Sequence, residues 1–152
     1  MIPKNHIIIG ALATIIIYLT LPITNFQAII IFLSSFLIDV DHYLIYILTK
    51  KDLSQKNARK FFHKKRIEWL KLPIREQAKY KRHIFMFHGI ESWILLLIIS
   101  TYYPIVLFIL YGFIIHMTLD YIEFIQYNQP FLAKFSQLWV YETNKKKKNF
   151  NY

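Results

Sequence analysis

The chain has 152 residues, of which 55% are hydrophobic and 18% aromatic, and its formal net charge is +10. With a mean hydropathy of +0.31 and its apolar residues in long blocks, the composition argues against an ordinary soluble domain and predicts a small polytopic membrane protein. The chain has no cysteine, which excludes disulfides, thiolate metal ligands and cysteine nucleophiles and restricts any metal site to nitrogen and oxygen ligands.

Four apolar runs are candidate membrane spans. They cover residues 7–23, 26–48, 84–103 and 104–124, and we expect the first to be a retained span because a second run follows it at once. Backbone in lipid must satisfy its hydrogen bonds within the span, so runs of this length predict helices. We therefore expect an all-α fold. Residues 1–128 should form a four-transmembrane-helix bundle, with a basic loop (49–83) between spans two and three. Residues 129–152 should form an interfacial helix and a basic tail.

The basic residues lie on one side of this topology. Of the 19 lysines and arginines, 1 precedes the first span, 13 lie within residues 50–82 and 5 follow the fourth span. Under the positive-inside rule, both termini and the long loop are cytoplasmic. The sequence thus predicts a multi-pass protein of the inner membrane.

The basic loop predicts an amphipathic helix over residues 54–70, with Phe61, Phe62 and Trp69 among the lysines and arginines. Such an element suits the anionic inner leaflet. It either gathers anionic substrates by electrostatic steering or serves only as an anchor. Residues 131–141 predict a second interfacial helix. We expect membrane lipids and anionic head groups as partners, and no specific nucleic acid, because no nucleic-acid-binding module accompanies the charge.

Ionisable side chains occur inside or at one end of all four apolar runs. They are His6, Asp39, Asp41, His42, His88, Glu91, His116 and Asp120. Each charge in hydrocarbon costs roughly 2.5 kcal/mol or more, so these groups should partner one another. Helices that alternate in direction, with a rise of about 1.5 Å per residue, bring them to a similar depth in the cytoplasmic half. We therefore expect one shared pocket.

The local spacing places most of these groups on common helix faces. Two pairs are spaced i,i+3 and one is spaced i,i+4: Asp39 with His42, His88 with Glu91, and His116 with Asp120. Histidine and carboxylate pairs at such spacings recur in metal sites inside helix bundles. Asp41 points to another face of a regular helix. It is therefore either a partner of a ligand or a sign that the helix loosens there.

These residues, in this order, resemble a known family. The chain shows His6 with Gly10, the box Asp39-Val40-Asp41-His42, the pair His83 and His88, and the box His116-Met117-Thr118-Leu119-Asp120. Over about residues 1–125 this is similar to the membrane-bound metal-dependent hydrolases of the YdjM type. Two positions depart from that family. Ile84 follows His83 where arginine is usual, and Phe87 and Gly89 flank His88 in place of threonine and serine.

The resemblance implies a ligand set and an activity. The implied metal ligands are His6, Asp39, His42, His83, His88, His116 and Asp120, with Glu91 or Asp41 as general base. The family is in turn similar to the zinc-dependent phospholipases C, which implies a hydrolase that cleaves a phosphoester or phospholipid at the cytoplasmic face with metal-activated water. The ligand types themselves suit zinc, with manganese or iron as alternatives.

The sequence is also compatible with other functions. A metal or proton transporter would also place ionisable groups in the membrane, although its sites usually lie near the midplane. A non-catalytic membrane adaptor that holds a partner on the basic loop need bind no metal. Purely structural polar pairs are a third alternative, but this many charges exceed the need of a single ion pair.

Overall fold

The structure is a computed structural model and describes residues 3–150. Within these residues the chain forms helices joined by loops and no strand, only one isolated bridge between Tyr80 and Lys148. The elements are α1 (Pro3–Thr20), α2 (Asn25–Leu37), α3 (Val40–Lys50), α4 (Gln55–Lys71), α5 (Ile74–Gln77), the 3-10 helix η1 (Met86–His88), α6 (Ile90–Ser100), α7 (Val106–Gln126), α8 (Leu132–Phe135) and α9 (Gln137–Asn144). The predicted all-α class is confirmed.

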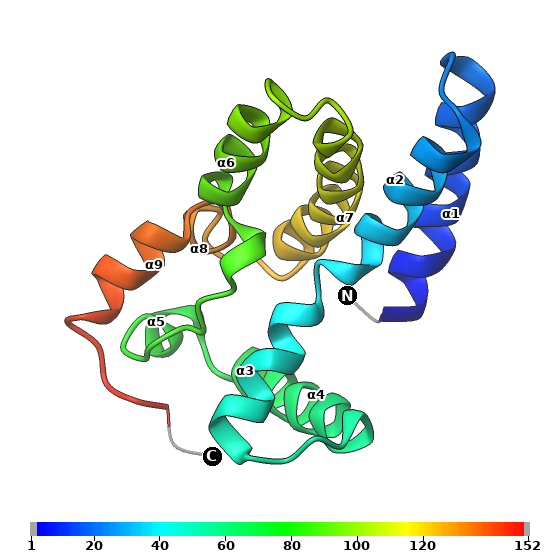
Figure 1. Ribbon diagram of the computed structural model, residues 1–152. Helices are drawn as coiled ribbons and strands as arrows, with labels where there is room; N and C mark the ends of the chain where they lie inside the picture. Colours follow the sequence, from blue (N-terminus) through cyan, green and yellow to red (C-terminus); the bar gives the residue numbers. More distant parts are fainter. Residues whose placement is uncertain (1–2, 151–152) are drawn as a thin grey trace.

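Four apolar helices form the main body. α2 packs against α1 and α7, and α6 packs against α7 (Figure 1). The two short connections, residues 21–24 and 101–105, lie at one end, whereas α3, α4, α5 and α9 lie at the other. The segments that hold most of the basic residues are therefore at the same end of the molecule.

Small residues let these helices approach closely. A Cβ atom on Gly112 of α7 would lie 1.9 Å from Ser34 Oγ and 2.5 Å from the carbonyl oxygen of Ile31, both on α2. A Cβ atom on Gly10 of α1 would lie 2.2 Å from Ser35 Oγ, again on α2. Glycine and serine at helix contacts are typical of apolar helices that pack without large side chains. This close packing sets α1 and α7 beside the same stretch of α2.

The second predicted span is not one regular helix. α2 begins at a capping box, in which Thr24 Oγ1 accepts from the Gln27 backbone and Gln27 Oε1 accepts from the Thr24 backbone. It ends at Leu37, and α3 begins at Val40 after a turn in which the backbone of Asp39 has φ −67° and ψ −2°. Figure 1 shows the chain changing direction there. The loosened helix considered for Asp41 is therefore present at residues 38–39, just before α3.

Two segments are long and apolar enough to cross a membrane, Asn25–Lys50 taken across this turn and Val106–Gln126. Two further apolar helices, Lys4–Thr20 and Ile90–Ser100, are shorter. In the predicted third span only the 11 residues of α6 are α-helical, about 16 Å of helix at the usual rise, because the chain before them forms η1 and an extended segment. The four-span bundle therefore stays a prediction.

The remaining helices cover the basic end. α4 matches the helix predicted over residues 54–70, and Ser54 caps it by accepting from the Asn57 backbone. The predicted interfacial helix at residues 131–141 is divided into α8 and α9, because Ser136 is extended and caps α9. These elements contact the N-terminal end of α6 and the C-terminal end of α7, near the polar residues.

Candidate metal centre

Five separate segments bring histidines and aspartates together. His6 comes from α1, Asp39 from the turn before α3, Asp41 and His42 from α3, His88 from η1, and His116 and Asp120 from α7. Three overlapping sets of these residues have ligand atoms within 4.8 Å of one another: His6, Asp39 and His116; Asp39, His42 and His88; and His88, His116 and Asp120. The predicted convergence of residues far apart in the sequence is thus present in the fold, and these sets could hold a metal ion.

His88 is held in a defined orientation. Its ring is 0% exposed, and its Nδ1 lies 3.0 Å from Asp41 Oδ2. That carboxylate oxygen also accepts from the backbone N–H of Phe87 at 3.2 Å. The other ring nitrogen, Nε2, has no hydrogen-bond partner among the described residues. It lies 3.3 Å from Asp39 Oδ1 and 3.8 Å from Asp120 Oδ2.

His116 repeats this arrangement from the opposite side. Its Nδ1 lies 2.9 Å from the carbonyl oxygen of Ser35, and its ring is also 0% exposed. Its Nε2 lacks a hydrogen-bond partner in residues 3–150 and lies 3.5 Å from both Asp39 Oδ1 and Asp120 Oδ2. Metal-binding histidines commonly donate one N–H to a carboxylate or a backbone carbonyl, which aims the other nitrogen at the ion. His88 and His116 both have this form.

His6 and His42 flank the two central histidines. The ring of His6 stacks on that of His116 at 4.0 Å, and its Nε2 lies 3.4 Å from Asp120 Oδ1. His42 is half-buried, and its Nδ1 lies 2.8 Å from Asp41 Oδ1 and 3.4 Å from Asp39 Oδ1. The Asp39 side chain is 32% exposed, whereas that of Asp120 is 7% exposed. The cluster therefore opens to its surroundings on the side of Asp39 and His42.

The charges of two of these carboxylates lack a fixed counter-charge. Within the described chain, Asp39 and Asp41 contact imidazoles and a backbone N–H, and neither has a lysine or arginine within 4.0 Å. Burying an ionised carboxylate costs several kcal/mol unless it is paired. Asp41 is buried, so its negative charge must be balanced by a protonated histidine or by a bound cation, whereas Asp39 is partly exposed.

Lys134 is a part of the cluster that the sequence reasoning missed. It lies in α8, its side chain is 10% exposed, and its ammonium is 2.7 Å from Asp120 Oδ2. From the sequence, Lys134 was placed only among the five basic residues that follow the fourth predicted span. The signal that could have found it is its position between Phe131, Leu132, Ala133 and Phe135, because a single lysine in an apolar stretch usually has a buried partner.

The structure places Glu91 outside this cluster. Its carboxylate accepts from Ser136 Oγ at 2.5 Å and from the backbone N–H groups of Gln137 and Leu138 at 3.1 Å. A carboxylate at a helix N-terminus satisfies free backbone donors, so Glu91 caps α9. The expected convergence of Glu91 with His88 does not occur, because the extended backbone of Gly89 separates η1 from α6.

His83 lies apart from the cluster, whereas Asp41 takes one of its expected places. His83 belongs to none of the three sets; its Nε2 lies 2.9 Å from the ammonium of Lys65 on α4. Burial, with the nearby charge of Lys65, lowers the pKa of His83 to about 4. Asp41 lies in the cluster, but its oxygens are engaged by His42 and His88. It is thus placed to orient histidines, as one of its two predicted roles required.

Comparisons of the chain with protein-family models, with curated proteins and with solved structures find no match.

Proposed function

We propose that this chain is a membrane-embedded metal-dependent hydrolase that cleaves a phosphoester at the cytoplasmic face. The observation that carries the proposal is the paired orientation of His88 and His116. Each ring has one nitrogen bound to a buried oxygen and the other directed, without a hydrogen bond, toward Asp39 and Asp120. A buried ring nitrogen without a partner is costly, and a divalent ion would satisfy both rings at once.

The proposed ligands are His6, Asp39, His42, His88, His116 and Asp120. The three overlapping sets together supply these six donor residues, and one or more ions could share them. Imidazole and carboxylate donors without sulfur suit zinc first, with manganese or iron as alternatives. His83, which the family resemblance implies as a ligand, is left out of the set because its ring faces Lys65.

A divalent ion held by these residues would supply Lewis-acid chemistry, which polarises a phosphoryl oxygen and lowers the pKa of bound water. The protein's own groups prepare the site. Asp41 Oδ2 and the Ser35 carbonyl fix which nitrogen of His88 and His116 carries the proton. Asp41 Oδ1 accepts from His42 Nδ1, which leaves His42 Nε2 as the atom able to bind an ion or take a proton. The partly exposed Asp39 and His42 mark the side from which substrate and water enter.

The surface of the apolar helices supports placement in a bilayer. In α6 no residue is buried, and Ile94, Leu95, Leu97 and Ile98 are each more than half exposed. On α1, Leu19 is 76% exposed. Such a large apolar surface is unfavourable in water but normal against lipid tails. We infer that α1 and α6 join the two longer segments in a four-span bundle. The end at which α3, α4, α5 and α9 lie (Figure 1) and both termini are then in the cytoplasm.

The test combines metal content with hydrolysis. Elemental analysis of the detergent-purified protein should find a bound divalent metal, and phosphate release should be measured from phospholipids, lipid pyrophosphates and nucleotides. Asp39→Asn and His116→Ala should lose both metal and activity. The control is His63→Ala, which removes an exposed histidine of α4 and should change neither. Full activity and metal content in Asp39→Asn and His116→Ala would rule out the proposed site, and bound metal with transmembrane flux but no hydrolysis would favour a transporter.

A further inference from the structure

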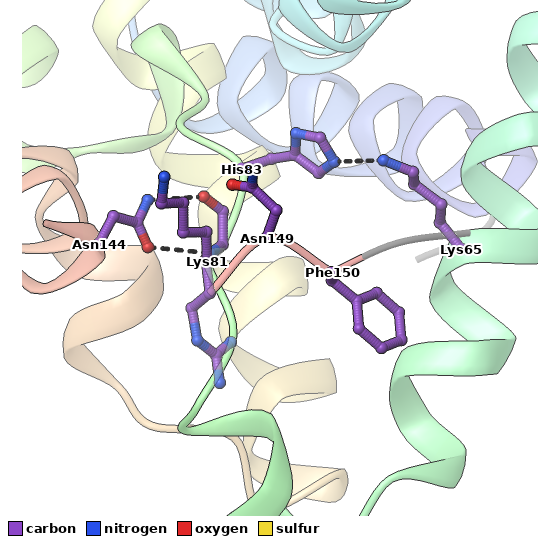
Figure 2. A pocket seen from close by; sticks show the side chains of 7 residues that line it. Lys65, Lys81, His83, Asn144, Asn149 and Phe150 are labelled. Atoms are coloured by element: carbon purple, nitrogen blue, oxygen red, sulfur yellow. Dashed lines mark hydrogen bonds between the residues drawn. The ribbon is translucent and has the colours of Figure 1, made fainter. Parts of the chain in front are cut away.

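A second polar site lies outside the histidine cluster. It is a pocket of about 310 Å³ between α4, the loop before η1 and the C-terminal segment. Its lining residues are Lys65, Lys81, Arg82, His83, Asn144, Asn149 and Phe150, none of them acidic. Figure 2 shows Lys65 reaching from α4 to the ring of His83, with Asn149 and Phe150 between the loop and α4. Among the described residues, the lining of the pocket is therefore basic, amide and aromatic, with no carboxylate.

The walls of the pocket are joined by hydrogen bonds to the backbone of the loop, some from the Asn144 side chain and some from the C-terminal backbone. Asn144 Oδ1 accepts from the Arg82 backbone at 2.9 Å, and Asn144 Nδ2 donates to the Arg82 carbonyl at 2.8 Å. The backbone of Lys148 donates to the Lys79 carbonyl at 3.0 Å and accepts from the Lys81 N–H at 2.9 Å. These bonds hold the loop against α9 and the C-terminal segment. The pocket is consequently a built feature of the fold and not a gap between free side chains.

Arg82, one of the basic residues that line the pocket, lies against two neutral side chains. The guanidinium of Arg82 lies 3.3 Å from Gln129 Oε1 and 4.9 Å from the ring of Trp69. Burial lowers the pKa of Arg82 to about 10, and burial together with the charge of Arg82 lowers the pKa of Lys147. Each shift means that the cationic form is less stable here than in water. An anion in the pocket would reverse this cost.

His83 contributes a neutral imidazole to the pocket lining, with one ring N–H as a hydrogen-bond donor. Its Nε2 accepts from the Lys65 ammonium, so its Nδ1 carries the ring proton. One layer of aromatic rings separates it from the histidine cluster: its ring lies 5.9 Å from that of Phe85, and Phe85 stacks on His42 at 3.8 Å. The pocket is thus next to the proposed hydrolytic site but does not share its ligands.

We propose that this pocket binds a phosphate group. One guanidinium, two ammonium groups and amide or imidazole N–H donors are the chemistry that phosphate oxygens accept most strongly. Its volume leaves space for the group to which the phosphate is attached. The phosphate comes either from the head group of an anionic lipid in the inner leaflet or from a soluble phosphate of the cytoplasm. The proposal does not depend on a metal ion in the histidine cluster.

The experiment is done with EDTA present, so that the metal site makes no contribution. In one arm, inorganic phosphate and pyrophosphate are titrated into the detergent-purified full chain by calorimetry. In the other, the chain is placed in nanodiscs of phosphatidylcholine with or without phosphatidic acid, and the ³¹P signal of the phosphomonoester is followed. Lys81→Gln and Arg82→Gln are the test variants. Lys56→Gln is the matched control, because Lys56 is exposed on α4 outside the pocket.

Each test variant should weaken binding about 10-fold, the usual effect of removing a hydrogen bond to a charged group, and Lys56→Gln should bind as the unchanged protein does. Saturable binding of free phosphate or pyrophosphate that both test variants weaken identifies a soluble source. A variant-sensitive ³¹P shift confined to phosphatidic acid identifies a lipid source. Because Lys81 is exposed, its variant should fold normally. Equal binding by Lys81→Gln and the unchanged protein in both arms, or an equal loss in Lys56→Gln, would overturn the proposal.

Discussion

Replacing Asp41 by asparagine tests whether the cluster is arranged to bind a metal. Asparagine has nearly the same shape as aspartate. The aspartate, however, accepts at both oxygens, from His42 Nδ1 at 2.8 Å and from His88 Nδ1 at 3.0 Å. The amide of asparagine has only one acceptor oxygen. One of the two histidines must therefore lose its anchor, and the ring that loses it can rotate or exchange its proton between nitrogens.

The size of the effect follows from this geometry. Asp41 is not a member of any of the three candidate ligand sets, so its removal should weaken metal binding without removing a ligand. Loss of such a supporting group typically lowers metal affinity 10–100-fold, which is about 1.4–2.8 kcal/mol. Asp39→Asn changes a carboxylate within two of the sets and should reduce affinity by more than about 100-fold, beyond the usual effect of a supporting group.

The measurement is a competition titration of zinc between the detergent-purified protein and a chromophoric chelator. Asp52→Asn is the matched control, because Asp52 is also an aspartate but accepts from Tyr46, Ser54 and Asn57 away from the cluster. It should bind zinc as the unchanged protein does. If Asp41→Asn binds zinc within a factor of two of the unchanged protein, the orienting role is refuted. If Asp39→Asn also does so, the metal site is refuted.

Four further predictions follow from individual contacts. Lys134→Met should lower the stability of the metal-free protein by about 3 kcal/mol, because it leaves the buried carboxylate of Asp120 without this ammonium; thermal unfolding should show part of the loss recovered with saturating zinc. Gly112→Ala should destabilise the fold by about 1–3 kcal/mol, because the new Cβ would lie 2.5 Å from a backbone carbonyl of α2; an unchanged melting temperature would contradict the close packing. Glu91→Gln should cost about 1 kcal/mol through the weakened cap of α9 and leave zinc affinity unchanged, whereas a loss of affinity would return Glu91 to the site. Burial lowers the pKa of His83 from 6.5 to about 4, so between these pH values the unfolded chain binds a proton at His83 that the folded chain does not. The contribution of His83 to the free energy of unfolding should therefore be full above pH 6.5 and fall as the pH approaches 4. Denaturant titrations at several pH values should show that His83→Gln removes this contribution to the pH dependence.

The sequence reasoning succeeded where residue type and spacing carry the information. The i,i+4 pair His116 and Asp120 lies on one helix and faces one pocket, as a regular α7 requires. Glu91 shows the limit of this reasoning. Its i,i+3 spacing from His88 suggested a common face, but the chain forms a 3-10 helix at His88 and starts α6 only at Ile90. Spacing predicts a shared face only where the helix is continuous.

Composition, charge distribution and the order of histidines and aspartates were enough to indicate an all-helical chain with apolar helices and a set of nitrogen and oxygen donors near its basic end. Only the tertiary structure decided which donors meet. It placed His88 against Asp41, His116 against the Ser35 carbonyl and Lys134 against Asp120, and it directed His83 to Lys65 instead. Hydropathy and local periodicity are properties of single segments and can be read along the chain. The position of a ring nitrogen depends on bends such as that at Asp39 and on contacts between distant helices, which no local pattern encodes.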